Sequence, residues 1–156
     1  MLLLRPPVIL IALGLAASAG ACTLKDDTKP AADIPPPADV AAPPANAIKT
    51  DSGIASKVIQ VGLGSIRPTV KSMVRVHYVG WTADGRMFDS SMKHGGPLNF
   101  TVGEVIPGWT EILQLMVIGE KRRVWIPGRL AYDNDPNPNS PKGQLCFEIE
   151  LIDILG

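Results

Sequence analysis

Alternation between hydrophobic and polar positions predicts several β-strands in the second half of the chain. The sequence marks strands at residues 54–62, 72–81, 122–127 and 144–155. In the second of these, Val74, Val76 and Tyr78 fall on one face, and the residues between them fall on the other. The third ends at Pro127, whose missing N–H cannot join a sheet ladder. The strands at 72–81 and 144–155, which alternate most clearly, are therefore each expected to have one face suited to burial.

One stretch has the spacing of an α-helix instead. In residues 105–116, large apolar side chains recur at i, i+3, i+4 and i+7, as on one helix face: Trp109, Ile112, Leu113 and Met116. Pro107 fits the first turn of such a helix, where its missing N–H costs nothing. Several strands with one helix predict an α+β fold in which an antiparallel sheet wraps on that helix. Trp109 is then either plain core or the floor of a pocket.

The first residues have the features of an export signal. Residues 1–21 contain no acidic side chain, carry a positive charge at Arg5 and continue into an apolar run. That run is shorter than the roughly 20 residues that a membrane-spanning helix needs, and small residues end it, as in secretory signals. Cys22 follows directly, which resembles the bacterial lipoprotein signal, in which this cysteine is lipidated. Ala19 replaces the large aliphatic residue usual there, so an ordinary signal peptide with an incidental cysteine is the alternative.

The composition changes between this signal and the strand-forming region. Residues 22–50 are rich in Pro and Ala and contain no aromatic residue. Such a segment cannot bury enough apolar area to offset the entropy of ordering, so it is predicted to be a disordered tether that holds a domain clear of the membrane. A proline-rich recognition motif is the alternative. Residues 51–156 are enough for one small domain.

Charge and motif content exclude several function classes. The formal net charge is +0 and the basic run at residues 121–123 is short, so nucleic acid is not an expected partner. The sequence has no nucleophile-elbow or P-loop motif, and its histidines, His77 and His94, lack metal-ligand spacing. Asp133 begins an alternation like that of a calcium loop, but Pro138 stands where glycine is required. Neither a metal nor a cofactor is therefore expected.

A set of apolar residues with a few polar groups remains. Core packing accounts for Trp109 and Phe147. It accounts less well for Tyr78, Asp89 and Tyr132, because hydroxyls and carboxylates beside apolar residues require partners. An apolar pocket with a few placed polar groups is the usual form of a ligand site. The sequence therefore predicts a pocket beside the helix.

Three stretches carry a specific family resemblance: VHYVGWTADGRMFDSS, GEVIPGWTEILQLMVIGEKRRVWIPGRLAY and PKGQLCFEIELIDI. Their order and spacing are similar to those of the FKBP-type peptidyl-prolyl isomerases, over about Gly53 to Ile154. The resemblance implies an antiparallel β-sheet half-wrapped around one short α-helix, with a proline pocket between them. By position it implies that the substrate contacts Tyr78, Phe88, Leu98, Val105, Ile106 and Phe147.

The resemblance also implies catalytic roles for three residues. Trp109 matches the floor of the family's pocket, Asp89 matches the polar residue at its rim, and the Tyr132 hydroxyl matches the group that binds a substrate carbonyl. The backbone N–H of Ile106 matches a second donor to the substrate.

The function implied is that of a peptidyl-prolyl cis-trans isomerase that acts on proline-containing polypeptides without a cofactor. Together with Cys22, it implies a lipid-anchored protein of the bacterial envelope, facing the periplasm or the cell surface, that assists the folding of exported proteins. Asn139 and Ser140 replace aliphatic residues usual at the pocket lip, so a non-catalytic module that binds proline-containing or apolar segments is the alternative. A monomer is expected, although the sequence leaves the oligomeric state open.

Overall fold

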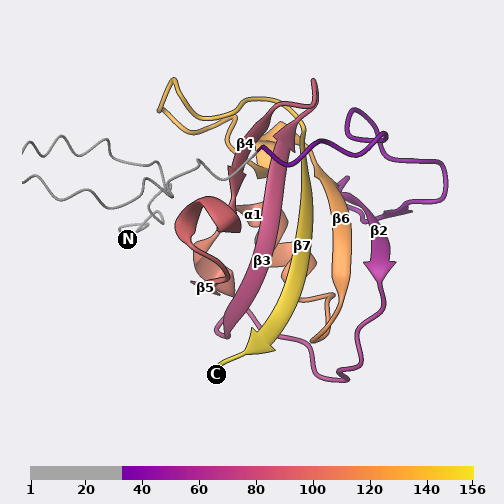
Figure 1. The fold of residues 1–156 in the computed structure, drawn as a ribbon, viewed down its shortest axis with the longest axis vertical. Coiled ribbons are helices and arrows are strands. Elements are labelled where there is room, and N and C mark those ends of the chain that lie inside the picture. Colours follow the sequence, from indigo (N-terminus) through magenta and orange to yellow (C-terminus); the bar gives the residue numbers. More distant parts are fainter. Residues whose placement is uncertain (1–32) are drawn as a thin grey trace, which may run out of the picture.

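The chain folds around one antiparallel sheet. The computed structural model describes residues 33–156, and Figure 1 shows their arrangement. The strands are β1 (Ile48–Lys49), β2 (Ala55–Gln60), β3 (Met73–Thr82), β4 (Met87–Ser90), β5 (Leu98–Thr101), β6 (Lys121–Ile126) and β7 (Leu145–Ile154). The helical elements are α1 (Pro107–Leu113) and the short 3-10 helices η1 (Ser91–His94), η2 (Val102–Glu104) and η3 (Gly128–Leu130).

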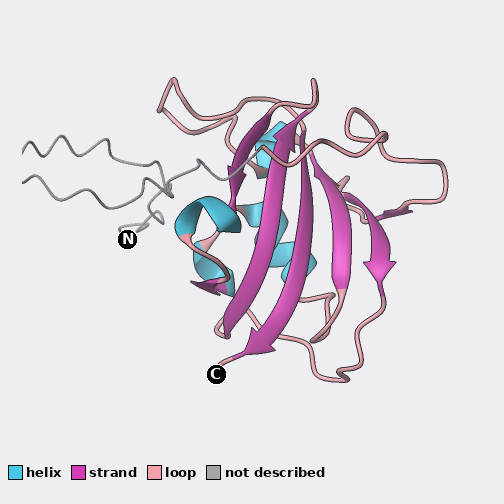
Figure 2. Cartoon of the chain, viewed as in Figure 1, coloured by secondary structure: helices cyan, strands magenta, loops and turns pink. Residues whose placement is uncertain are grey.

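The sheet divides along its longest strands. Neighbouring strands follow the order β1-β2-β6-β7-β3-β4, and β5 pairs with the first half of β3. The last part of β3 pairs with β4 instead, so β3 is where the sheet splits into two edges. Figures 1 and 2 show α1 behind β3 and β7. The predicted α+β architecture, an antiparallel sheet half-wrapped around one short helix, is confirmed.

The helix is shorter than its apolar spacing predicts. It begins at Pro107, in the first turn, and ends at Leu113. Met116 lies beyond that end, yet it is fully buried, because the Met116 N–H bonds to the Leu113 carbonyl and the chain continues in tight turns. The prediction that the helix reaches Met116 is therefore wrong, although the side chain keeps the inward position that the spacing gave it.

The main core lies between α1 and the inner face of the sheet. Its members are inward residues of the strands, of α1 and of the segments that adjoin them, namely Ile54, Val74, Val76, Tyr78, Val102, Trp109, Ile112, Leu113, Met116, Val124, Ile126, Leu145, Phe147, Ile149 and Leu151. On β3, the predicted face of Val74, Val76 and Tyr78 is the one that is buried. Burial of each large apolar side chain contributes roughly 1.5–3 kcal/mol before entropy is counted, so α1 is held firmly against the sheet.

A second, smaller core covers the opposite face of the sheet. One row of residues crosses four strands there: Ala55 on β2, Trp125 on β6, Cys146 on β7 and Trp81 on β3 are cross-strand neighbours. All four are buried. Residues 33–47, here called the N-terminal strap, cover this row and add three partly buried side chains, Ile34, Val40 and Ala47.

The prediction of a disordered tether over residues 22–50 is wrong for residues 33–47, because this strap packs against the sheet. Both indole N–H groups of the covered row donate to its backbone: Trp81 Nε1–H to the Ile34 carbonyl and Trp125 Nε1–H to the Asp39 carbonyl, each at 2.9 Å. Asp39 also forms an ion pair with Arg123 at 2.6 Å. The physical reason is that two tryptophans on an outer sheet face need both an apolar cover and hydrogen-bond acceptors, a need that the composition of the strap does not reveal.

Other predictions fall on residues that the structure does not describe. The export signal at 1–21, the lipidation of Cys22 and the part of the tether before residue 33 all lie outside the described residues. Within residues 33–156, no helix has the length and apolar character needed to cross a membrane.

Candidate functional site

A cavity of about 810 Å³ opens between the start of α1, the inner face of the sheet and the segment after η3. This volume lies within the range of small-ligand sites. The residues that line it are Met73, Tyr78, Phe88, Asp89, Asn99, Phe100, Thr101, Glu104, Val105, Ile106, Pro107, Trp109, Arg129, Ala131, Tyr132, Asn134, Asp135, Pro136 and Phe147. They come from strands, loops and helix, so the tertiary fold assembles the site.

Trp109 is the centre of an aromatic cage. Its ring meets Tyr78 at 5.1 Å, Phe147 at 5.5 Å and Phe100 at 5.7 Å between ring centroids, each edge to face. Phe88 extends the cage through an edge-to-face contact with Phe147 at 5.5 Å. Such pairs favour fixed ring orientations. Trp109 is only 5% exposed and still lines the cavity, so it is both core and pocket floor, and its indole N–H has no hydrogen-bond partner among the described residues.

A carboxylate fixes one wall of the cavity. The Tyr78 hydroxyl donates a 2.6 Å hydrogen bond to Asp89 Oδ2. Burial, and then this bond, raises the pKa of Tyr78 above its ordinary value. The other carboxylate oxygen, Oδ1, accepts the Ser90 backbone N–H at 2.8 Å and lies 2.9 Å from Nε2 of His94. Asp89 is therefore held from both of its oxygens.

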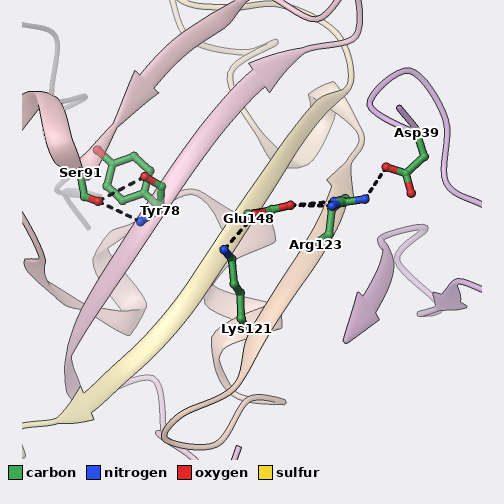
Figure 3. Close-up of polar contacts among 6 residues, drawn as sticks. All are labelled: Asp39, Tyr78, Ser91, Lys121, Arg123 and Glu148. Carbon is green, nitrogen blue, oxygen red and sulfur yellow. Dashed lines mark hydrogen bonds and ion pairs between the residues drawn. The ribbon is translucent and has the colours of Figure 1, made fainter. Parts of the chain in front are cut away.

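The backbone of Tyr78 is clamped where pairing between β3 and β4 ends. That ladder runs from Val79 to Trp81 on β3 and does not include Tyr78. Figure 3 shows the Ser91 hydroxyl bridging the Tyr78 backbone instead: Ser91 Oγ accepts the Tyr78 N–H at 3.1 Å and donates to the Tyr78 carbonyl at 3.3 Å. The Ser91 side chain thus takes the place of a β4 partner for the Tyr78 backbone. This fixes the backbone from which the Tyr78 ring lines the cavity.

Two residues that line the cavity carry a hydrogen-bond donor without a partner in the described part of the chain. The Tyr132 hydroxyl makes no hydrogen bond there, and burial with the nearby Asp89 and Asp135 carboxylates raises the pKa of Tyr132 to about 12. Tyr132 therefore keeps its proton at neutral pH. The backbone N–H of Ile106, just before α1, is the second such donor.

The segment after Tyr132 is held by its own polar groups. Lys142 donates to the Tyr132 carbonyl at 2.8 Å, and Asp133 Oδ1 accepts the Gly143 N–H at 2.8 Å. The Asp133 N–H donates to the Gly128 carbonyl at 3.0 Å. These bonds close the segment on itself and so fix the position of Tyr132 at the cavity.

The apparent calcium alternation has a structural use. Asp135 accepts the Asn137 N–H at 2.9 Å and the Ser140 hydroxyl at 2.7 Å, and the Asn137 side chain accepts the Asn139 N–H at 2.9 Å. The oxygens of these side chains thus bond within the loop. No group of three His, Cys, Asp or Glu side chains within residues 33–156 is arranged to hold a metal ion.

All but one of the predicted pocket residues line the cavity. Leu98 is the exception: it lies on β5 and packs against the main core. Phe100, two residues further on the same strand, lines the cavity and contacts Trp109. The alternation of apolar and polar residues from Leu98 to Thr101 is the signal that could have identified it. At the lip, Asn139 and Ser140 do not line the cavity; Asn134, Asp135 and Pro136 do.

The arrangement suits an uncharged ring flanked by carbonyl groups. The aromatic cage could take up such a ring, and the donors of Tyr132 and Ile106 that lack a partner among residues 33–156 could bond carbonyl oxygens beside it. Apolar walls keep water from the bound group. The group could change conformation there without a covalent bond to the protein.

Comparisons with known proteins agree with this geometry. The family model for FKBP-type peptidyl-prolyl cis-trans isomerase matches residues 64–152. The chain is 46% identical, over 108 residues, to the FKBP-type 22 kDa peptidyl-prolyl cis-trans isomerase of Escherichia coli, covering 68% of this chain and 52% of the relative. It is 43% identical to the outer membrane protein MIP of Legionella longbeachae over 105 residues, 66% of this chain and 45% of that protein.

Solved structures give the same result. FkpA from Escherichia coli superposes with a TM-score of 0.65 at 35% identity, over 71% of this chain and 52% of that chain. A peptidyl-prolyl cis-trans isomerase from Pseudomonas syringae superposes with a TM-score of 0.64 at 35% identity, over 71% of this chain and 82% of that one. The chain spans about half the length of the curated relatives it matches.

Proposed function

The chain belongs to the FKBP-type peptidyl-prolyl cis-trans isomerase family, and we propose that it accelerates rotation about X-Pro bonds in exported polypeptides. The observation that carries this proposal is the Trp109 cage with its two free donors, Tyr132 and the Ile106 N–H, at the edge of an apolar cavity. A prolyl ring and its flanking carbonyls have the shape and hydrogen-bonding capacity that this cavity accepts.

The proposed chemistry is selective stabilisation of a twisted amide. Rotation about a peptide bond breaks amide resonance and has a barrier of about 18–20 kcal/mol. The twisted amide is less polarised than the planar one, so an apolar cavity disfavours the planar ground state relative to the transition state. Trp109 supports the pyrrolidine ring. The Tyr132 hydroxyl and the Ile106 N–H hold the flanking carbonyls while the bond between them turns.

Asp89 contributes through position and charge. It orients Tyr78, whose ring forms the wall beside Trp109. Its carboxylate also adds a negative potential at the rim of the cavity, close to the Tyr132 hydroxyl. Both effects act on a bound prolyl segment without a covalent step.

The proposed location is the bacterial cell envelope, with a lipid on Cys22. Support comes from the signal-like residues 1–21 followed by Cys22, and from a relative that bears the name outer membrane protein MIP. The substrates are then exported chains that contain proline and pass close to the membrane.

A protease-coupled assay on an X-Pro peptide tests the activity. We expect the purified chain to accelerate isomerisation, and Trp109→Leu to remove most of that acceleration. A folded protein that binds the peptide without any rate above background would support the alternative, a module that holds proline-containing segments. A folded protein that neither binds nor accelerates would refute both.

A further inference from the structure

A histidine completes the polar group at the cavity rim. His94 ends η1, and its Nε2 lies 2.9 Å from Asp89 Oδ1. The other oxygen of Asp89 accepts the Tyr78 hydroxyl at 2.6 Å. The side chains of His94 and Asp89 are 18% and 20% exposed, so this contact is largely shielded from solvent.

On the isomerase function proposed above, we propose that His94 is a positioning residue that makes turnover of prolyl peptides depend on pH. Histidine is the side chain whose charge ordinarily changes between pH 5 and 8. A neutral imidazole can donate an ordinary hydrogen bond from Nε2 to Asp89, whereas an imidazolium donates a charge-assisted one, which is roughly twice as strong. The stronger bond holds Asp89, and through it Tyr78, more firmly at the wall of the cavity.

Other titratable groups near the pair do not duplicate this role. On β3, Tyr78 stays protonated because its pKa is raised, and His77 bonds the Ser91 hydroxyl at 2.9 Å. On η1, Lys93 is turned toward Asp33 of the strap at 4.0 Å. The groups beyond Asp89 are Tyr132 and Asp135, which interact with it or with each other electrostatically. Among the described residues, His94 is the only basic side chain within ion-pair distance of Asp89.

The backbone fixes where His94 stands. Gly95 follows it with φ of 88°, a left-handed conformation that favours glycine, and the Gly95 N–H caps η1 by bonding to the Met92 carbonyl. The Gly96 N–H bonds to the Ser91 carbonyl at 3.1 Å. The histidine is therefore held beside Asp89 by a closed turn and does not rely on a free loop.

The test compares pH profiles of kcat/KM between pH 5.5 and 8.5 on the full chain and three variants. His94→Arg keeps a permanent positive charge beside Asp89, and His94→Gln keeps a neutral donor. We expect kcat/KM of the parent to fall about two- to fivefold as pH rises, consistent with the difference between charged and neutral hydrogen bonds. We expect His94→Arg to stay near the parent's low-pH value and His94→Gln near its high-pH value, both without the pH step. His77→Gln is the matched control and should keep the parent's profile.

A second measurement separates this inference from the isomerase proposal. The carboxyl carbon of Asp89, observed by NMR, should shift with the same midpoint as the His94 ring and lose that step in His94→Gln. If the pH step in kcat/KM persists in His94→Gln, the role of His94 is overturned while the isomerase function stands. The same holds if the Asp89 carboxyl signal does not change with the His94 ring. Absence of any rate in the folded parent, at every pH, overturns the isomerase function and with it the role of His94 in turnover.

Discussion

Gly80 lies directly opposite Phe147 in the ladder between β3 and β7. A Cβ atom at Gly80 would come within 2.8 Å of Phe147 Cε1 and 2.6 Å of Phe88 Cζ. The absence of a side chain at this position is what lets the two phenyl rings meet edge to face behind the cavity. The packing of Phe88 against Phe147 in the aromatic cage thus requires a glycine at position 80.

Gly80→Ala should therefore damage both folding and binding. The added methyl group must displace Phe88 or Phe147, and we expect the free energy of unfolding to fall by about 1–3 kcal/mol, as for other overpacked cores. Affinity for a prolyl peptide should fall as well. Denaturant unfolding and peptide titration measure the two effects. Adding Phe88→Leu should recover part of the stability, and two additive losses would show that the rings are not coupled through Gly80.

The two tyrosines of the cavity should respond differently to loss of their hydroxyls. Tyr132→Phe removes a hydroxyl without a partner among the described residues, so the melting temperature should stay the same while kcat/KM falls about two- to tenfold. Tyr78→Phe takes a donor away from Asp89 and should cost about 1–3 kcal/mol of stability. Thermal melts alongside the isomerase assay distinguish them. Equal melting losses in both variants would contradict these assignments.

The ion pairs of the strap offer another matched comparison. Asp39 pairs with Arg123 at 2.6 Å and is 25% exposed, whereas Asp33 lies 4.0 Å from Lys93 and is 82% exposed. Asp39→Asn should lower the free energy of unfolding by about 1–2 kcal/mol. Asp33→Asn should change it by less than about 0.5 kcal/mol, as for exposed pairs. Unfolding in urea, at low and high salt, measures both, and equal effects would mean that the strap is not anchored at Asp39.

Figure 3 shows how this anchor extends across the outer face. Arg123 on β6 bridges Asp39 of the strap to Glu148 on β7, and Lys121 reaches the same glutamate at 3.2 Å. Loss of Asp39 leaves Arg123 with Glu148, which is why the expected cost is modest.

Cys146 should behave as an inert thiol at neutral pH. Burial raises the pKa of Cys146 to about 12 from the ordinary 9.0, against the smaller opposing effect of Arg123. At pH 8 a thiol reagent should label it only after unfolding in a chain that begins at Asp33. The native state binds this proton more tightly, so its contribution to stability is present below about pH 9 and is lost as pH rises toward about 12. Cys146→Ala should show a shallower alkaline decline, and rapid native labelling would contradict the burial.

Local pattern is a good guide where a strand has two distinct environments. β7 was predicted at 144–155 and is observed at Leu145–Ile154, because one set of alternate residues belongs to the main core while the residues between them are mostly only partly buried. β4 and β5 were not predicted. Each has four residues, too few for a clear period. β4 is the second strand of a short hairpin with β3, and β5 is defined by pairing with the start of β3, more than 20 residues earlier.

The cavity could be predicted only in part. Trp109, Tyr132 and Asp89 were identified from the sequence as pocket candidates, with roles taken from the family resemblance, and they do line the same cavity. Leu98 was assigned to the pocket by position. It packs against the main core on the same face of β5 as Phe100, but only Phe100 lines the cavity. The contact between His94 and Asp89 depends on the turn that closes η1, which a motif comparison does not describe.

The strap also sets a length. If Cys22 carries a lipid, as proposed, the chain leaves the bilayer there and is first held to the domain at Ile34. Covalent geometry then limits the leash to about 40 Å, against about 100 Å had the domain begun at Asp51. The distance of the proline cavity from the lipid surface would then be limited by this short segment and the width of the domain. Newly translocated chains would meet the cavity at the membrane, before they diffuse away.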